Sequence, residues 1–468
     1  MAEAQTQVAL RPARRRLPPG PRGLTLLRDS LTLGQDWSGF LARCARDYGD
    51  IVYFRFLNVP VCLVVHPDAI EQVLVRSQAN FLKSRDYRAL RPILGNGLLT
   101  SEGEFWQAQR KLIQPAFRHE NIVTYAEIMS RSAAAMLAGW HNGDVRDIHA
   151  EMMTLTLEVV AKSLFGSDVT EHARGVADAM TTVMELFTMQ ANWAFVLPDG
   201  IPIPKNKRLR SAIKHLDDVV YKLIRERRAM GLSHSDGDGA SAGGADLLST
   251  LLTMKDEAGG RMTDVQLRDE IMTLFLAGHD TTANALTWTW YLLAQNPEAD
   301  AALAAELRSV LGGRAPIAAD LPRLPYTEMV IKESMRLYPP AWGVGRRAIR
   351  DFELDGYTLP AKTNFFLLQW VTQRDARFFP DPQRFDPERW RVDPIRSGKL
   401  PRFAYFPFGG GPRVCVGAGF AMMEATLLLA TIAQRFRFTL APNQSVEPLF
   451  SVTLRPKSGI RMHLHSRA

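Results

Sequence analysis

A cysteine in a glycine-rich frame is the part of this sequence best suited to chemistry. Residues 408–417 read FGGGPRVCVG, and their three consecutive glycines allow the backbone to approach a ligand closely. An apolar helical pattern runs from Val416 to about Phe436, so Cys415 is expected at the N-terminus of a helix. The partial positive charge of that terminus and the nearby Arg413 are expected to lower the pKa of the thiol. The segment therefore predicts a reactive or metal-binding thiolate.

Two other pairs of residues have the spacing to act together. Trp106 and Arg110 lie one helical turn apart and could contact one anionic group, although an ordinary amphipathic helix shows the same pattern. Glu333 and Arg336 lie three residues apart and share a helix face, which by itself indicates only a solvated surface salt bridge. Neither pair identifies a site without further context.

A long helix is predicted over 263–295. At 1.5 Å per residue it would span roughly 50 Å, so it is expected to cross a large domain. Its centre, 277–282, reads AGHDTT. There Gly278 weakens a helix by about 1 kcal/mol relative to Ala, and Thr281 can bond back to a carbonyl and bend the helix. Such a bend would open room for small molecules. His279, in the same segment, is expected to be a helix-face histidine with no metal role.

The remaining patterns must build the frame that positions these residues. Apolar residues at spacings of three and four predict helices over much of 68–310, most clearly at 150–165 and 211–228. The segment 231–245 is rich in Gly, Ser, Ala and Asp and is predicted to be a surface loop. Regions rich in β-branched and aromatic residues are predicted strands, the first of them a hairpin. These regions are 51–65, 346–370 and 448–465. The expected fold is mainly α with a small β region, an α+β arrangement.

Composition excludes several classes of protein. Of the 468 residues, 46% are hydrophobic and 23% charged, values typical of globular rather than disordered or fibrous chains. Three cysteines are too few for a disulfide scaffold and fit a reducing compartment; Cys44 and Cys62 are expected to be buried apolar residues. No apolar run reaches the ~18 residues of a membrane span, and residues 1–10 are too polar for a signal peptide. A cytoplasmic protein without a membrane span is expected.

The net charge of +8 is spread along the chain. Its one dense run is the arginines at the end of a polar tail, 1–16. No stretch interleaves clustered Lys and Arg with aromatic residues, so no nucleic-acid partner is expected. The basic excess favours solubility, an acidic protein partner or an anionic membrane surface, and the charge count alone does not choose among them.

The segment 408–417 resembles the haem-ligand loop of the cytochrome P450 superfamily, whose pattern is Phe-Gly-x-Gly-x-Arg-x-Cys-x-Gly. Every fixed position of that pattern is met. The resemblance implies the superfamily's fold, with a long central helix over the haem. It makes Cys415 the thiolate ligand of the iron of haem b, iron protoporphyrin IX. The other loop residues that it places around the haem are Phe408, Gly411 and Gly417.

Other motifs follow in the superfamily's order. By resemblance, Trp106 and Arg110 bind one haem propionate, and Arg346 and Arg413 supply the other propionate contacts. Arg347 is adjacent to Arg346, so the assignment could shift by one residue. Paired donors of this kind suit the two carboxylates of haem.

Two more motifs carry the resemblance. The helix centre resembles an oxygen-binding groove, in which Ala277 contacts the cofactor, Thr281 supports hydrogen bonding to bound O2 and Asp280 helps gate protons. Three residues resemble a buried structural triad that shapes the haem side without a catalytic role. They are Glu333, Arg336 and Arg389.

The resemblance implies a haem-thiolate monooxygenase formed by one domain, 17–468, with neither a membrane anchor nor a fused reductase. It would insert one atom of O2 into a lipophilic small molecule, such as a fatty acid, terpenoid or polyketide-like compound. Electrons would come from NAD(P)H through a separate ferredoxin and its reductase, and a monomer is expected. A peroxide-using or rearranging enzyme of the same fold and a non-catalytic haem sensor are the alternatives. The adjacent Asp280 and Thr281 argue against the first alternative, because those chemistries do not need delivered protons. The residues do not exclude a sensor, although a sensor gains little from an oxygen-activation groove.

Family position also implies a substrate pocket and a docking face. Arg85, Arg88 and Arg91 lie near the presumed entrance and could hold a carboxylate or be solvated. The side of the haem that carries the cysteine should present basic residues to an acidic ferredoxin. These basic residues include Lys111, Arg118, Lys399 and Arg402. The implied pocket residues, mostly apolar, are Leu98, Leu99, Phe187, Trp193, Phe195, Ala341, Trp342, Val344 and Val452.

Overall fold

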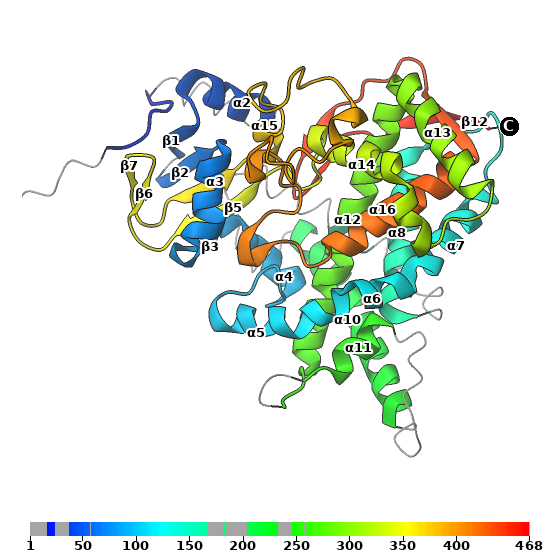
Figure 1. Cartoon of the computed structure of the whole chain (residues 1–468). Helices are drawn as coiled ribbons and strands as arrows, with labels where there is room; N and C mark the ends of the chain where they lie inside the picture. The colour runs from blue at the N-terminus through cyan, green and yellow to red at the C-terminus, as the bar shows by residue number, and fades with distance from the viewer. Residues whose placement is uncertain are drawn as a thin grey trace, which may run out of the picture.

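The computed structural model describes residues 16–23, 37–56, 58–166, 179, 182–183, 204–232, 246–255 and 259–467. A small β-rich part and a larger helical part lie side by side, and the helix α12 runs through the helical part (Figure 1). The mainly helical fold with small sheets confirms the predicted class. Among the described residues, no helix is both long enough and apolar enough to cross a membrane.

The central helix α12 spans Asp264–Gln295. Thr263 caps it through a reciprocal capping box with Gln266, which satisfies two backbone donors at its start. It packs along α8, Ile148–Phe165. A Cβ added at Gly278 would lie 3.0 Å from Cγ2 of Val160, so the glycine allows the two helices to approach closely. The helix is continuous through its centre, and Gly278 serves this packing.

Other helices surround α12 and share its core, in which Trp288 and Trp290 are among the largest fully buried side chains. The longer ones are α7 (Ala126–Leu137), α10 (Pro204–Leu232), α13 (Pro297–Leu311), α14 (Pro325–Leu337) and α16 (Ala418–Ala433). The helices α2 (Trp37–Tyr48) and α3 (Pro67–Glu71) belong to the β-rich part. The remaining helices are α4 (Arg91–Leu94), α5 (Gly103–Ile113), α6 (His119–Ile122), α11 (Leu247–Thr253) and α15 (Gln369–Thr372).

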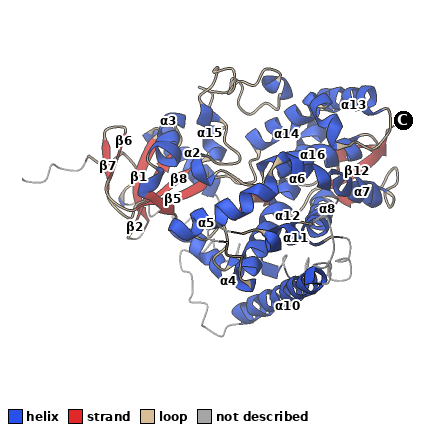
Figure 2. Cartoon of the chain, turned by 60° about the horizontal axis from the view of Figure 1, so that its bottom comes forward, coloured by secondary structure: helices blue, strands red, loops and turns tan. Residues whose placement is uncertain are grey.

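The largest sheet has five strands in the order β1-β2-β8-β5-β3. The predicted hairpin forms its antiparallel β1–β2 pair, and β2 pairs in parallel with β8, with Val61 opposite Asn364. A second sheet has the order β4-β12-β9, and it lies at the opposite end of the molecule (Figure 2). The strands of the first sheet are β1 (Ile51–Phe56), β2 (Val59–Val64), β3 (Phe81–Lys83), β5 (Val344–Ala348) and β8 (Asn364–Leu367). Those of the second are β4 (Val145–Asp147), β9 (Phe436–Leu440) and β12 (Arg461–Ser466).

Two small hairpins complete the β structure. They are β6 (Phe352–Leu354) with β7 (Tyr357–Leu359), and β10 (Pro448–Phe450) with β11 (Leu454–Pro456). The N-terminal segment 16–21 runs along the first sheet. The carbonyl of Pro19 accepts a hydrogen bond from the Tyr53 N–H at 2.9 Å, and that of Arg16 accepts one from the Thr358 N–H at 2.9 Å. This segment therefore joins β1 to the β6–β7 hairpin.

Two predicted boundaries differ from the structure. The helix expected over 416–436 is α16, which ends at Ala433, and Phe436 begins the strand β9. Residues 435–438 alternate polar and apolar, and this local period of two pairs with β12. The predicted loop 231–245 begins within α10, because Gly231 and Leu232 are helical; the rest of it lies outside the described residues.

Candidate active site

The cysteine loop lies between the first sheet and α16, and it folds back on itself. The Cys415 N–H donates to the Phe408 carbonyl at 3.0 Å, which closes the turn. Gly411 has a φ of 68°, and a Cβ there would lie 2.0 Å from the Leu74 carbonyl oxygen. Only glycine fits this conformation and this close approach. Gly417 is the N-cap residue of α16, so the thiol lies just before the helix, as predicted.

The thiol of Cys415 is exposed, unlike those of Cys44 and Cys62, which are buried as predicted. Protein packed around it nevertheless raises its pKa by desolvation, while the Gly417 N–H and the charge of Arg110 oppose that rise. The predicted fall in the thiol pKa is therefore wrong for the free thiol, because desolvation outweighs the helix terminus. A bound metal ion would favour the thiolate through its own charge.

Arg413 is held between an acid and an aromatic ring. Its guanidinium pairs with Glu102 and lies over the Trp106 ring, 4.6 Å from the centroid. Its Nη1 atom is buried and has no hydrogen-bond partner among the described residues. On the same helix as Trp106, Arg110 donates to the Val414 carbonyl at 2.9 Å. The loop and α5 thus bring three of the four predicted propionate contacts together.

The fourth predicted contact, Arg346, lies on the strand β5 and is 7% exposed. Burial lowers its pKa, and the positive charge of Arg413 lowers it further, whereas Tyr87 and Glu102 oppose this effect. Arg346 therefore shares an environment with Arg413 and Glu102. Arg347 experiences the charges of Arg85 and Arg88 instead, as expected for the opposite face of a strand. The assignment to Arg346 is the one that this geometry supports.

These features fit a haem. A propionate carboxylate is the acceptor that the unpaired Nη1 of Arg413 lacks. Ala277 is exposed and Thr281 partly exposed within a helix that is otherwise mostly buried. A bound haem would cover both this open surface inside the fold and the exposed thiol of Cys415.

The predicted oxygen groove has a defined hydrogen-bond pattern. The Thr281 hydroxyl donates to the Ala277 carbonyl at 2.5 Å, one turn earlier on α12. Asp280 is 3% exposed, and its Oδ2 accepts a hydrogen bond from the Thr453 hydroxyl at 2.5 Å. The Asn284 amide donates to the same hydroxyl at 3.3 Å. Asp280 is thus held in the protein interior, and Thr281 faces the open part of the site.

His279 occupies the opposite face of the helix. It is 4% exposed, and burial lowers its pKa, so the imidazole is neutral. The described residues contain no group of three or more His, Cys, Asp or Glu side chains able to hold a metal ion.

The predicted triad is assembled around one carboxylate. Arg336 donates to both oxygens of Glu333, at 2.9 and 2.8 Å, and both side chains are fully buried. The Arg389 guanidinium lies 3.3 Å from the same carboxylate. The Trp390 indole N–H and the Asp386 backbone N–H also donate to it, at 2.9 and 3.0 Å. Arg336 is further bonded to the carbonyls of residues 373, 382 and 384, so the pair fixes the chain that precedes the cysteine loop.

The predicted pocket residues have mixed environments. Leu98 is buried, and its N–H donates to Glu270 of α12 at 2.9 Å. Trp342 packs against the apolar cluster beneath α2 and β1, and its indole N–H donates to the Ser451 carbonyl at 2.8 Å. The half-buried members are Leu99, Ala341, Trp342, Val344 and Val452. Phe187, Trp193 and Phe195 lie outside the described residues.

Three residues at the site were missed by sequence reasoning. Glu102 and Thr453 carry no motif, and they bond to Arg413 and Asp280, which lie 311 and 173 residues away along the chain. Trp390 could have been found, because it directly follows Arg389, which belongs to the predicted triad. Its indole N–H donates to the same carboxylate as Arg389, that of Glu333.

Comparison with known proteins agrees with this geometry. The chain matches the family model "Cytochrome P450" over residues 18–463. Cyclooctatin synthase of Streptomyces melanosporofaciens is 40% identical over 430 residues, which cover 92% of this chain and 91% of that protein. Pentalenene oxygenase of Streptomyces avermitilis is 35% identical over 90% of this chain and 91% of that protein.

Two further matches extend the comparison. Cyclooctat-9-en-7-ol 5-monooxygenase of Streptomyces melanosporofaciens is 34% identical over 91% of this chain and 90% of that protein. The solved structure of retinoic acid-bound cyanobacterial CYP120A1 superposes with a TM-score of 0.84 at 26% identity, covering 97% of this chain and all of that one.

Proposed function

We propose a terpenoid substrate for this protein, which belongs to the cytochrome P450 family and is accordingly a haem-dependent monooxygenase. Three relatives that align with about nine-tenths of the chain are named for compounds of the cyclooctatin and pentalenene types, which are polycyclic terpenoids. The fatty-acid and polyketide-like classes, which the residues alone left open, lack such support. The observation that carries the assignment of the site is the exposed Cys415 thiol at the end of its glycine loop.

The chain's own residues have separable tasks in this proposal. Cys415 would be the iron ligand, and Trp106, Arg110, Arg346 and Arg413 would hold the haem carboxylates. When bound, the haem supplies the binding and reductive activation of O2. We assign the last proton transfer to the Thr281 hydroxyl. To donate into the open part of the site, that hydroxyl must leave its bond to the Ala277 carbonyl.

We assign proton supply to Asp280. The carboxylate is buried, and the Thr453 hydroxyl fixes its Oδ2. A proton that reaches Thr281 from this side therefore passes through a carboxylate that is already oriented. Asp280 and Thr281 are adjacent residues of one helix, so the backbone fixes their positions relative to each other.

We further propose a ferredoxin and its reductase as the electron donors, a monomeric state and a cytoplasmic location. Support for the location comes from the cysteines, since all three are free thiols, as in a reducing compartment. The basic residues near the cysteine loop support an acidic donor.

The test is reconstitution of the haem-loaded protein with NADPH, a ferredoxin and its reductase. Pentalenene, cyclooctat-9-en-7-ol and dodecanoic acid are offered separately under isotope-labelled O2. We expect a product with one labelled oxygen atom from a terpenoid and little from dodecanoic acid. Oxidation of dodecanoic acid alone would contradict the substrate class. Product formed with hydrogen peroxide but not with NADPH and the redox proteins would contradict the electron-transfer route.

A further inference from the structure

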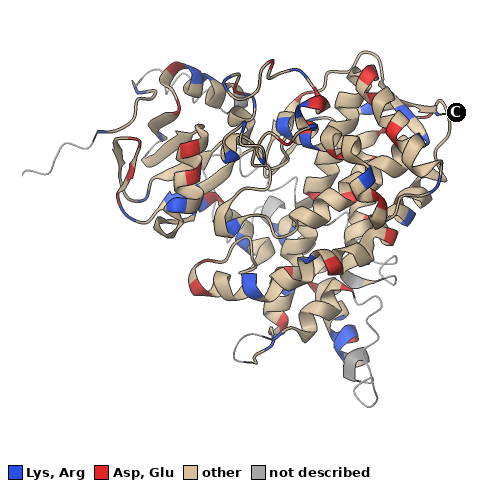
Figure 3. Ribbon diagram, viewed as in Figure 1, with Lys and Arg blue, Asp and Glu red and all other residues tan. Residues whose placement is uncertain are grey.

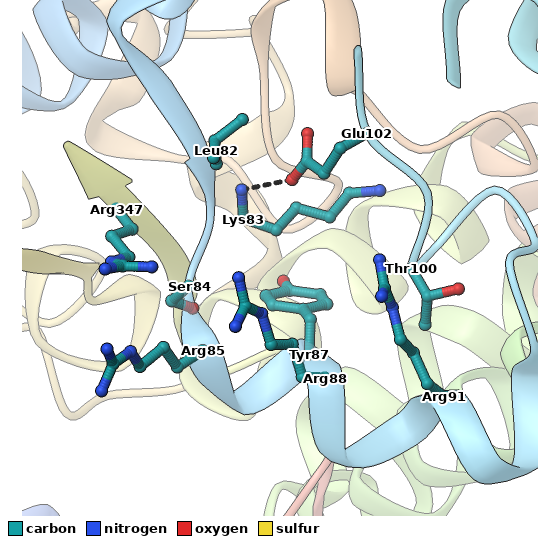
Figure 4. Close-up of a pocket in the computed structure, with 10 residues that line it drawn as sticks. All are labelled: Leu82, Lys83, Ser84, Arg85, Tyr87, Arg88, Arg91, Thr100, Glu102 and Arg347. Carbon is teal, nitrogen blue, oxygen red and sulfur yellow. Dashed lines mark hydrogen bonds between the residues drawn. The ribbon is translucent and has the colours of Figure 1, made fainter. Parts of the chain in front are cut away.

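A small basic cavity lies beside the predicted substrate pocket. Its volume is about 50 Å³, and it is lined by residues from β3, from the following 3-10 turn Arg85–Leu90 and from β5 (Figure 4). Arg85 and Arg88 extend from the turn, and Arg347 extends from the strand β5. The turn and β5, which are distant in the sequence, thus place guanidinium groups around one space.

This cavity contains more positive charge than its acids balance. Among the described residues, neither a salt bridge nor a side-chain hydrogen bond joins Arg85, Arg88 or Arg347 to a carboxylate. The one acidic residue that lines the cavity, Glu102, pairs with Arg413 on the other side. Burial lowers the pKa of Arg347, and the charges of Arg85 and Arg88 lower it further, so the guanidinium groups are near enough to repel one another.

One atom of this cluster is also unsatisfied. The Nε atom of Arg347 is buried and has no hydrogen-bond partner among the described residues. A buried N–H without an acceptor destabilises the folded state, and more so when the group is charged. Like charges held together and a buried donor without an acceptor are both relieved by one bound anion.

The cavity adjoins the pocket through the segment 98–101. Thr100 lines the cavity, while Leu98 is one of the predicted pocket residues. Lys83 connects the two, because its ammonium donates to the carbonyls of Leu98 and Ser101 at 2.9 and 2.8 Å. An anionic group in the cavity would therefore lie near the segment that carries Leu98. Apolar side chains of the predicted pocket could then contact the rest of the same molecule.

We propose that this cavity binds the carboxylate of the substrate, so that the molecule oxidised is a lipophilic, terpenoid-type acid. The inference rests on the proposed function and refines its substrate class. Planar guanidinium groups suit a carboxylate, because two parallel N–H donors match its two oxygens. Arg347 presents this group from a strand, whose backbone is fixed by pairing on both sides.

The test measures how tightly the haem-loaded protein binds three matched pairs of an acid and its alcohol. Binding is detected by the change in the haem spectrum. The pairs are retinoic acid and retinol, farnesoic acid and farnesol, and dodecanoic acid and dodecanol. We expect retinoic acid or farnesoic acid to bind tenfold or more tightly than its alcohol. Arg347→Gln and Arg88→Gln should each weaken that acid severalfold and leave the alcohol within twofold. Arg55→Gln, an exposed arginine on β1, is the matched control and should change neither.

Three results would overturn the inference. In the first, neither retinoic acid nor farnesoic acid binds more tightly than its alcohol, even if dodecanoic acid does. In the second, the two cavity variants weaken acid and alcohol equally, which would indicate altered folding. In the third, inorganic phosphate measured by calorimetry binds in an Arg347-dependent way but does not compete with the acid, which would make the cavity a free-anion site. Terpenoid hydrocarbons would still be oxidised in each case if the proposed function holds, so the two failures are distinguishable.

Discussion

At the scale of single residues, Cys415 differs from the other two cysteines in exposure rather than in its intrinsic chemistry. Replacement of its sulfur by oxygen in Cys415→Ser removes the soft, electron-donating ligand but preserves the size of the side chain. We expect the reduced, carbon monoxide-bound variant to lose the red-shifted absorption band of thiolate-ligated haem. Cys44→Ser and Cys62→Ser, at buried positions, should keep that band even where they lower stability. A band that survives in Cys415→Ser would contradict the assigned ligand.

Two adjacent residues of α12 should fail in different ways. Thr281→Ala removes the donor that faces the open site, and we expect continued NADPH consumption with about tenfold less product and more released peroxide. Asp280→Asn removes the buried acid, and we expect turnover to slow roughly 100-fold, the usual scale of general acid–base catalysis. Both outcomes are read from NADPH, peroxide and product measured together.

The matched control for this pair is Thr287→Ala. The Thr287 hydroxyl makes the same kind of bond as Thr281, to the Ala283 carbonyl at 2.7 Å, but it is fully buried. Its loss should leave the yield of product per NADPH unchanged. Equal yields in Thr281→Ala and the original protein would remove Thr281 from the proposed proton transfer.

The residues found from sequence share one property: each lies in a short motif. Cys415 and Arg413 belong to one ten-residue segment, and Glu333 and Arg336 face each other across one helical turn. Their partners were found only where a second motif contained them, as for Arg389. The tertiary fold brings Glu102 and Thr453 to the site. No local pattern marks them, because their partners lie 311 and 173 positions away in the sequence.

At the scale of elements, the contact between α16 and α12 includes a buried acid. Glu424 of α16 is fully buried near Thr282, and burial raises its pKa from 4.5 to about 8. The folded chain therefore holds this proton more tightly than the unfolded chain does. Stability is lost as the pH rises from about 4.5 towards 8, on the order of 3–6 kcal/mol in total, and no further above that.

Glu424→Gln should remove this dependence, because the amide keeps the shape and does not ionise. We expect the variant to match the original protein near pH 5 and to exceed it in stability increasingly up to pH 8, as measured by urea unfolding at several pH values. Glu104→Gln, at an exposed position on α5, controls for the loss of one charge. A difference in stability that stays constant with pH would contradict the buried, protonated state.

Helices and strands were predictable where apolar residues repeat with a regular local spacing. The hairpin at 51–65 and the helices at 150–165 and 263–295 appear as β1–β2, α8 and α12. The parallel pairing of β2 with β8 was not predictable, since it joins residues about 300 positions apart, as in Val61 with Asn364. The end of α16 was misjudged because the apolar run continues into β9, and only the change of period marks the boundary.

At the scale of the whole molecule, basic and acidic residues are distributed over both parts of the fold (Figure 3). The four basic residues predicted to meet a ferredoxin are all exposed. Three of them adjoin residues that contact the cysteine loop. Lys111 follows Arg110, Arg118 follows Phe117, whose ring would lie 3.8 Å from a Cβ on Gly417, and Arg402 precedes Phe403, which packs on Gly410.

Electron transfer should therefore weaken with salt. The Debye length falls from about 10 Å at 0.1 M to 3 Å at 1 M, so we expect ferredoxin-dependent reduction to slow about tenfold over that range. Lys111→Glu and Arg402→Glu should slow it at low salt, whereas Arg55→Glu, on β1, should not. The measurement is stopped-flow reduction followed by carbon monoxide binding. A rate that depends on neither salt nor these charges would leave the basic excess as a matter of solubility.

The segment 16–21 has a further consequence. β1 is an edge strand of the five-stranded sheet, and such an edge can recruit a strand from another chain. The segment covers that edge with three prolines, which lack the N–H groups needed to extend a ladder. At Gly20 it approaches so closely that a Cβ would lie 2.0 Å from the Tyr53 carbonyl oxygen. A second chain could not add to the sheet at β1 without first displacing this segment, which makes it a built-in barrier to aggregation.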